Sequence, residues 1–132
     1  LEGLNKAYGT RILISDVVRD GVADQFLTRP VDRVQPAGST QPIMVYELLG
    51  ALDGDDDVIA ASLEAHRRCA RWTEIYDAYL ARDWTGVGSL IDAFLVDFPD
   101  DGVALVYRER ARRYASAPPA DDWDGVEISD RK

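Results

Sequence analysis

The chain has 132 residues, of which 46% are hydrophobic and 30% charged, the composition of a globular protein with one domain or two small ones. Its net charge of −9 would repel phosphate groups, which argues against binding to nucleic acid or to anionic lipid. No run of 18 apolar residues is present, so no membrane contact is expected in this segment. The lone Cys69 fits a reducing compartment, and we expect a cytoplasmic protein.

The first residues alternate between helical and strand patterns. Residues 1–8 resemble the end of a helix that Gly9 stops. Residues 11–15 read as a short strand, after which Ser15 is placed to cap a second helix. The expected apolar stripe of that helix consists of Val17, Val18 and Val22.

Two further strands are predicted over residues 26–35 and 43–49, joined by the turn-rich sequence PAGST at 36–40. Proline cannot donate a hydrogen bond to a strand ladder, so the prolines of this region belong at sheet edges, bulges or strand ends. They are Pro30, Pro36 and Pro42.

An acidic linker is expected at residues 53–57, where the sequence lacks apolar anchors. The pattern then becomes helical over residues 58–82 and 84–98, with apolar side chains at spacings of three and four. A third helix, capped by Asp100 or Asp101, is predicted to run to the prolines that end the helical region at residue 118.

The acidic tail, residues 119–132, is expected to be loose, except that Trp123 and Val126 are candidates to dock back. The tail also contains an echo, because ARDWTGV at 81–87 recurs as ADDWDGV at 120–126. The spacing does not match a tetratricopeptide period of 34 residues, so a single helical hairpin with a capping helix is the better description.

Three segments in a fixed order carry a family resemblance: LEGLNKAYGTRILIS, FLTRPVDRV and PAGSTQPIMVYELL. Together they resemble the C-terminal part of a class III adenylate/guanylate cyclase catalytic domain, and they cover residues 1–49. The resemblance implies an α+β fold for residues 1–52, the C-terminal portion of a ferredoxin-like domain. After the linker, we expect residues 58–118 to form an all-α, tetratricopeptide-like helical region.

The resemblance also implies a function for the parent enzyme. Such cyclases convert ATP or GTP to the 3′,5′-cyclic nucleotide and pyrophosphate, with two Mg²⁺ (or Mn²⁺) ions and sites at the interface of two paired catalytic domains. A homodimer is therefore expected. In the family, the metal-binding aspartates, the purine-selecting residues and the transition-state Asn and Arg precede the segment that matches here. We therefore expect an inactive fragment of an intracellular signalling enzyme, with no catalytic, cofactor-binding or metal-binding residue.

The hairpin turn is the remaining part of the family's active-site neighbourhood. Family members commonly carry two lysines around its glycine, and here Ala37 and Ser39 occupy those positions. The amide of Gly38 and the hydroxyl groups of Ser39 and Thr40 keep a phosphate contact open, while a purely structural turn is the plainer interpretation.

Other polar groups of residues 1–52 have ordinary explanations. An i, i+4, i+8 spacing on the second helix predicts a solvated acidic stripe rather than a metal site; the stripe is Asp16, Asp20 and Asp24. Arg29 and Arg33 flank Asp32, and we expect local ion pairs among them, with little effect on stability if they are exposed.

Two candidate sites lie further along the chain. The carboxylates Asp53, Asp55, Asp57 and Glu64 match positions of a calcium-binding loop. However, Val58 occupies the position that normally requires glycine, which argues against calcium. His66 and Cys69 suggest a catalytic pair, but their helical spacing favours surface and packing roles.

The alternative to a cyclase fragment is a non-enzymatic interaction module. In that case the helical region would bind a peptide or protein partner or drive oligomerisation. The two readings differ in whether catalytic residues precede the chain, and in whether the helical face has an apolar groove.

Overall fold

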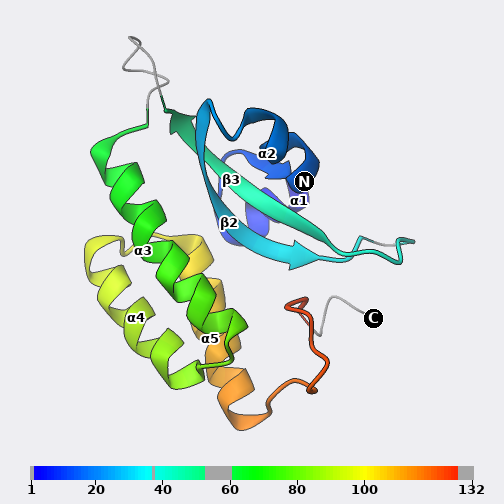
Figure 1. The fold of residues 1–132 in the computed structure, drawn as a ribbon. Helices are drawn as coiled ribbons and strands as arrows, with labels where there is room; N and C mark the ends of the chain where they lie inside the picture. Colours follow the sequence, from blue (N-terminus) through cyan, green and yellow to red (C-terminus); the bar gives the residue numbers. More distant parts are fainter. Residues whose placement is uncertain (1, 37, 53–60, 128–132) are drawn as a thin grey trace.

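The computed structural model describes residues 2–36, 38–52 and 61–127. The described chain is mixed α/β, with one three-stranded antiparallel sheet and five helices (Figure 1). In chain order the elements are α1 (Glu2–Tyr8), β1 (Leu13–Ser15), α2 (Asp16–Val22), β2 (Phe26–Val34), β3 (Ile43–Ala51), α3 (Leu63–Leu80), α4 (Trp84–Asp97) and α5 (Gly102–Ser116).

The sheet has the order β1–β3–β2, so the longest strands form a hairpin and β2 is an edge strand. Pro30 lies on this edge strand, as expected for a residue without an amide hydrogen. The register shifts between Pro30 and Asp32, which is a β-bulge at Val31. As a result both Val31 and Asp32 are buried, with 0% and 1% exposure.

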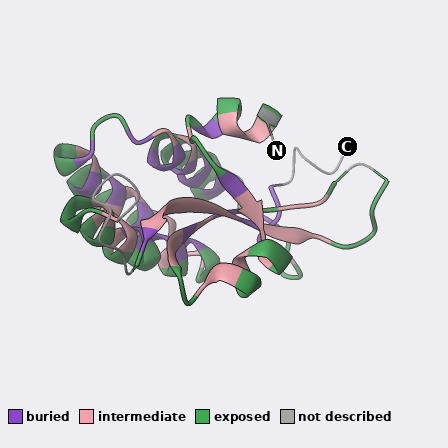
Figure 2. Ribbon diagram, turned by 90° about the horizontal axis from the view of Figure 1, so that it is seen from above, coloured by how far each residue is buried: buried purple, intermediate pink, exposed green. Residues whose placement is uncertain are grey.

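Helices surround the sheet on three sides. The helix beside the N-terminus, α1, and the helix that follows β1, α2, lie on opposite faces of the sheet (Figure 2). The helices α3, α4 and α5 form a three-helix unit beside β2, and α3 contacts that strand directly (Figure 1). The unit therefore covers the edge of the sheet where another strand would otherwise pair.

Aspartate and serine side chains set the helix starts. α3 begins five residues later than the periodicity indicated, because the Ser62 hydroxyl accepts a hydrogen bond from the Ala65 amide at 3.0 Å. Asp83 caps α4 in the same way. Of the two candidates for the third helix, Asp101 is the cap: its carboxylate accepts from the Ala104 amide at 2.9 Å.

The expected apolar stripe of α2 was wrong. Val17 and Val18 are 78% and 50% exposed, and Val22 is only half-buried. The helix is seven residues long and covers Tyr46 of β3 with the Arg19 guanidinium, 5.0 Å from the ring centre. The acidic stripe is also shorter than expected, because Asp24 lies beyond the end of α2 and Asp16 accepts a hydrogen bond from the Met44 amide.

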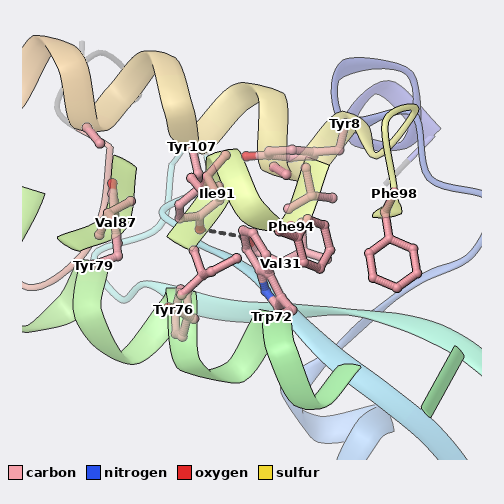
Figure 3. Packing of buried hydrophobic residues seen from close by; sticks show 14 of the residues in the cluster. Tyr8, Val31, Trp72, Tyr76, Tyr79, Val87, Ile91, Phe94, Phe98 and Tyr107 are labelled. Atoms are coloured by element: carbon pink, nitrogen blue, oxygen red, sulfur yellow. Dashed lines mark hydrogen bonds between the residues drawn. The ribbon is translucent and has the colours of Figure 1, made fainter. Parts of the chain in front are cut away.

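One hydrophobic core joins the sheet to the helical unit. Trp72 of α3 packs edge-on against Tyr107 of α5, with ring centres 5.0 Å apart, and both rings lie against Val31 of β2 (Figure 3). Tyr8 of α1 and Val45 of β3 belong to the same cluster. The core therefore extends across the boundary expected between residues 52 and 58.

The sequence echo does not produce a structural repeat. Its first copy starts α4, whereas its second copy forms turns outside any helix or strand. The two tryptophans nevertheless meet, since the rings of Trp84 and Trp123 lie 5.8 Å apart and both pack on Tyr79. Each copy of the repeated sequence thus contributes one tryptophan to the same aromatic cluster.

Candidate functional site

The most conspicuous polar group of the structure is a buried network around Asp32. Arg110 of α5 donates two hydrogen bonds to the Asp32 carboxylate, Nη1 to Oδ1 at 3.0 Å and Nη2 to Oδ2 at 2.8 Å. The hydroxyl of Tyr8 donates to the same carboxylate and accepts from Arg110. Tyr107 lies against it as well, with its hydroxyl 2.5 Å from the Val31 carbonyl oxygen and 3.3 Å from Asp32 Oδ1. Residues from α1, β2 and α5 therefore meet at one carboxylate.

A second network surrounds Arg29, which is 2% exposed. Its Nε donates to Glu47 on β3 at 2.8 Å, and its Nη1 donates to Asp101 at 2.8 Å. Asp101 also caps α5 and lies 3.4 Å from Arg68 of α3. The expectation of local ion pairs between Arg29, Asp32 and Arg33 was therefore wrong, because Arg29 and Asp32 pair with side chains far along the chain.

Side chains of the helical unit donate hydrogen bonds to backbone carbonyl oxygens of the edge strand β2. The Cys69 thiol donates to the carbonyl oxygen of Thr28 at 3.2 Å, and the Trp72 indole donates to that of Pro30 at 2.5 Å. Together with the bond from Tyr107 to Val31, these contacts replace part of the ladder that a neighbouring strand would form. Cys69 thus has the packing role predicted for it.

The tail is docked through residue 127, which corrects the expectation of a loose segment. Glu127 is 3% exposed and accepts hydrogen bonds from Arg113 and Tyr114, at 2.7 and 2.9 Å; it also forms an ion pair with Arg110 Nε at 2.7 Å. Val126 is fully buried, in agreement with its predicted docking. Residues 128–132 of the predicted tail lie outside the described residues.

A cleft of about 830 Å³ opens beside these groups, a size within the range of small-molecule sites. It lies between α1, α5, the tail and the open end of the β2–β3 hairpin. Its walls are apolar where Leu4, Val34 and Val106 line it, and charged where Arg110 and Glu127 do.

Tyr8, which lines the cleft, and Tyr107, which lies beside Asp32, stay protonated at neutral pH. Burial, together with the neighbouring Asp32 carboxylate, raises the pKa of Tyr8 and that of Tyr107 well above the usual tyrosine value. Burial alone would also raise the pKa of Glu127, but Arg110, the hydrogen bond from Tyr114 and Arg113 outweigh it and lower that pKa. Glu127 is therefore ionised, and it anchors the tail. The buried network holds the side chains around Asp32 in one arrangement.

The residues singled out from the sequence do not gather in this cleft. His66 is exposed on α3, and Cys69 faces β2. In the turn, the Ser39 hydroxyl donates to the Gln41 carbonyl at 3.1 Å and accepts from the Gln41 amide at 3.2 Å, the pattern of a structural turn. Ala37 and the linker carboxylates Asp53, Asp55 and Asp57 lie outside the described residues.

Sequence reasoning missed Asp32, Arg110 and Glu127 as a connected set. The one local signal was a lone carboxylate beside Val31 in a predicted strand, which is costly to bury unless the carboxylate is paired. The sequence near Asp32 does not identify Arg110 as the partner, because the two residues are 78 positions apart.

Comparisons with known proteins add no relative: no family model, curated protein or solved structure matches this chain. Within the described residues, no three His, Cys, Asp or Glu side chains are grouped so that they could hold a metal ion. Across the same residues, no helix combines the length and apolar character that crossing a bilayer requires.

Proposed function

We propose that residues 1–52 are the C-terminal portion of a class III nucleotide cyclase catalytic domain, in a cytoplasmic enzyme that converts ATP or GTP to the 3′,5′-cyclic nucleotide and pyrophosphate. The observation that carries the proposal is the three family-like segments, which occur in the family's order over residues 1–49. They fall on one uninterrupted run of elements from α1 to β3.

An exposed apolar surface supports the idea that further parts of a domain cover this sheet. Ile12, Val17 and Val18 are at least half exposed, and all three lie on or next to β1 and α2. Exposed apolar side chains gathered in one region are typical of surfaces that pack against protein. In the proposed enzyme, the rest of the catalytic domain would pack there.

The chain itself has a structural role in this proposal. The two Mg²⁺ (or Mn²⁺) ions of the reaction would be held by aspartates outside this segment, because in the cyclase family the metal-binding aspartates precede the part that residues 1–49 resemble. What this chain supplies is the hairpin β2–β3 and the helical unit that holds it. The homodimer of the proposed enzyme would form between complete catalytic domains.

The proposal is tested by comparing two proteins. We expect the 132-residue chain, incubated with Mg²⁺ or Mn²⁺ and ATP or GTP, to yield no cyclic nucleotide. The same chain, produced together with the coding sequence upstream of Leu1, should yield it. The matched control replaces the metal-binding aspartates of the extended protein by alanine. Turnover by the short chain above a boiled control, or an inactive extended protein, would contradict the proposal.

A second candidate is a non-enzymatic module that binds a protein or peptide, and the cleft favours it. Apolar walls from Leu4, Val34 and Val106, beside a few fixed charges, are typical of sites that take an apolar side chain. A screen of small peptides by NMR would test it, with shifts at Val34, Ile43 and Val106 as the expected result. Shifts spread over the surface would count against this candidate.

A further inference from the structure

Residues 117–127, here called the strap, cross from the end of α5 to the cleft without forming a helix or strand. Their far end is held by Arg82, whose Nη atoms donate to the carbonyl oxygens of Pro119, Ala120 and Asp121 at 3.2, 2.6 and 3.0 Å. In the middle, Trp123 packs on the aromatic cluster and donates to the Val126 carbonyl at 2.7 Å. The strap is therefore fixed along its length.

At its other end the strap shares one side chain with the sheet. Arg110 lies between two buried carboxylates, that of Glu127 on the strap and that of Asp32 on β2. Its Nε lies 2.7 Å from Glu127 Oε2 in an ion pair, while its two Nη atoms donate to Asp32. Because a guanidinium is planar and rigid, fixing one of its edges fixes the direction of the other. The contact with Glu127 thus sets where Arg110 meets β2.

The outer part of the hairpin is less buried than the rest of the sheet. Asp32 is the last buried residue of β2 before the turn, and Val45 is the first buried residue of β3 after it. Between them, Val34 and Ile43 are half-buried; they pack against the margin of the core and also line the cleft. The Asp32–Arg110 contact is therefore the last fully buried attachment of β2 before the turn.

We propose that the strap controls the order of the β2–β3 hairpin through Glu127 and Arg110. While Glu127 is docked, Arg110 is held against Asp32 and the hairpin is fixed. When the strap is released, Arg110 loses one of its two anchors and the hairpin end loosens. The consequence for activity rests on the proposed function, in which this hairpin borders the nucleotide site; the strap would then be a means of regulating that site.

Hydrogen exchange in the full chain tests the proposal. Glu127→Gln keeps the size of the side chain but removes the charge that Arg110 and Arg113 bind. Arg82→Asn releases the far end of the strap without touching Arg110, and asparagine tolerates the positive φ of 64° at this position. Asp122→Asn, at an exposed position of the same strap, is the control with the same charge change as Glu127→Gln.

Both strap variants should speed amide exchange at residues 32–34 and 43–45 by about tenfold or more, with α4 unchanged, while the control changes neither. Unchanged exchange in the hairpin would overturn the proposal. Equal acceleration in the hairpin and in α4 would also overturn it, because the strap would then contribute only to global stability. The measurement needs no nucleotide, so its failure is distinguishable from a failure of the cyclase assay.

Discussion

Asp32 and Arg110 are 78 residues apart in sequence and form a two-bond ion pair, with 1% and 7% of their side chains exposed. One partner lies on the edge strand of the sheet and the other on the last helix. Because a buried charge without its partner is costly, this pair commits the sheet and the helical unit to one arrangement.

Removing one partner of the pair should therefore be severe. We expect Arg110→Met to lower the free energy of unfolding by about 3–5 kcal/mol, because it leaves Asp32 buried without a cation and Glu127 with Arg113 alone. In the double variant with Asp32→Asn, the loss should be smaller than the sum of the two single losses. Urea unfolding of the four proteins measures this. The control is Arg112→Met, in an exposed pair, with an expected change within about 0.5 kcal/mol. Additive losses would contradict direct coupling.

Gly102 at the start of α5 is required by the close approach of α1. A Cβ at this position would lie 2.2 Å from the carbonyl oxygen of Tyr8, a backbone atom that cannot move aside cheaply. We expect Gly102→Ala to destabilise the protein by about 1–3 kcal/mol, although alanine is the better helix former. Gly88→Ala in α4 is the matched control, since nothing lies within 4 Å of its Cβ. It should stabilise by up to about 1 kcal/mol, as thermal unfolding will show; a stabilising Gly102→Ala would disprove the contact.

The anchor at Glu127 predicts a loss of stability in acid. The pKa of Glu127 is lowered in the folded chain, so its ion pairs contribute fully above the usual glutamate pKa of about 4.3. That contribution is lost as the pH falls through the lower, folded-state pKa. Wild type should therefore lose more free energy of unfolding than Glu127→Gln between about pH 5 and about pH 3. Parallel pH profiles for the two proteins would show that the carboxylate is not the anchor.

The thiol of Cys69 should react slowly with alkylating reagents. Burial raises its pKa, an effect that Arg29 only partly offsets, and its thiol donates to the Thr28 carbonyl oxygen at 3.2 Å. Because the thiolate is the reactive form, we expect alkylation at about pH 8 to be at least about tenfold slower in the native chain than in denaturant. The unfolded chain is the control. Equal rates in the two states would mean that Cys69 does not face β2.

The secondary structure was largely predictable because its signals are local. Helical spacing, the caps at Ser15 and near residue 101, and the turn between the two long strands all come from a few neighbouring residues. The start of α3 was missed because a serine cap at Ser62 competes with a weak periodicity before it. The exposure of the valines on α2 was not predicted, because a short apolar stripe in the sequence does not show whether another element covers it.

The candidate site was not predictable from the same signals. Glu127 and Asp32 meet at Arg110 only because a bulge turns Asp32 inward and the strap returns across α5. In the local sequence, Arg110 and Glu127 resemble ordinary surface charges. Such pairings depend on the packing of distant elements, and no spacing rule covers them.

We conclude that the sheet and the helical unit fold as one body. All three tryptophans lie in residues 63–127, so their fluorescence reports on the helical part, while the methyl NMR signals of Val31 and Val45 report on the sheet. Urea unfolding followed by both probes on one sample should give a single shared midpoint, because the core and both ion-pair networks cross between the parts. Two separate midpoints, with the sheet melting before the helices, would contradict the claim.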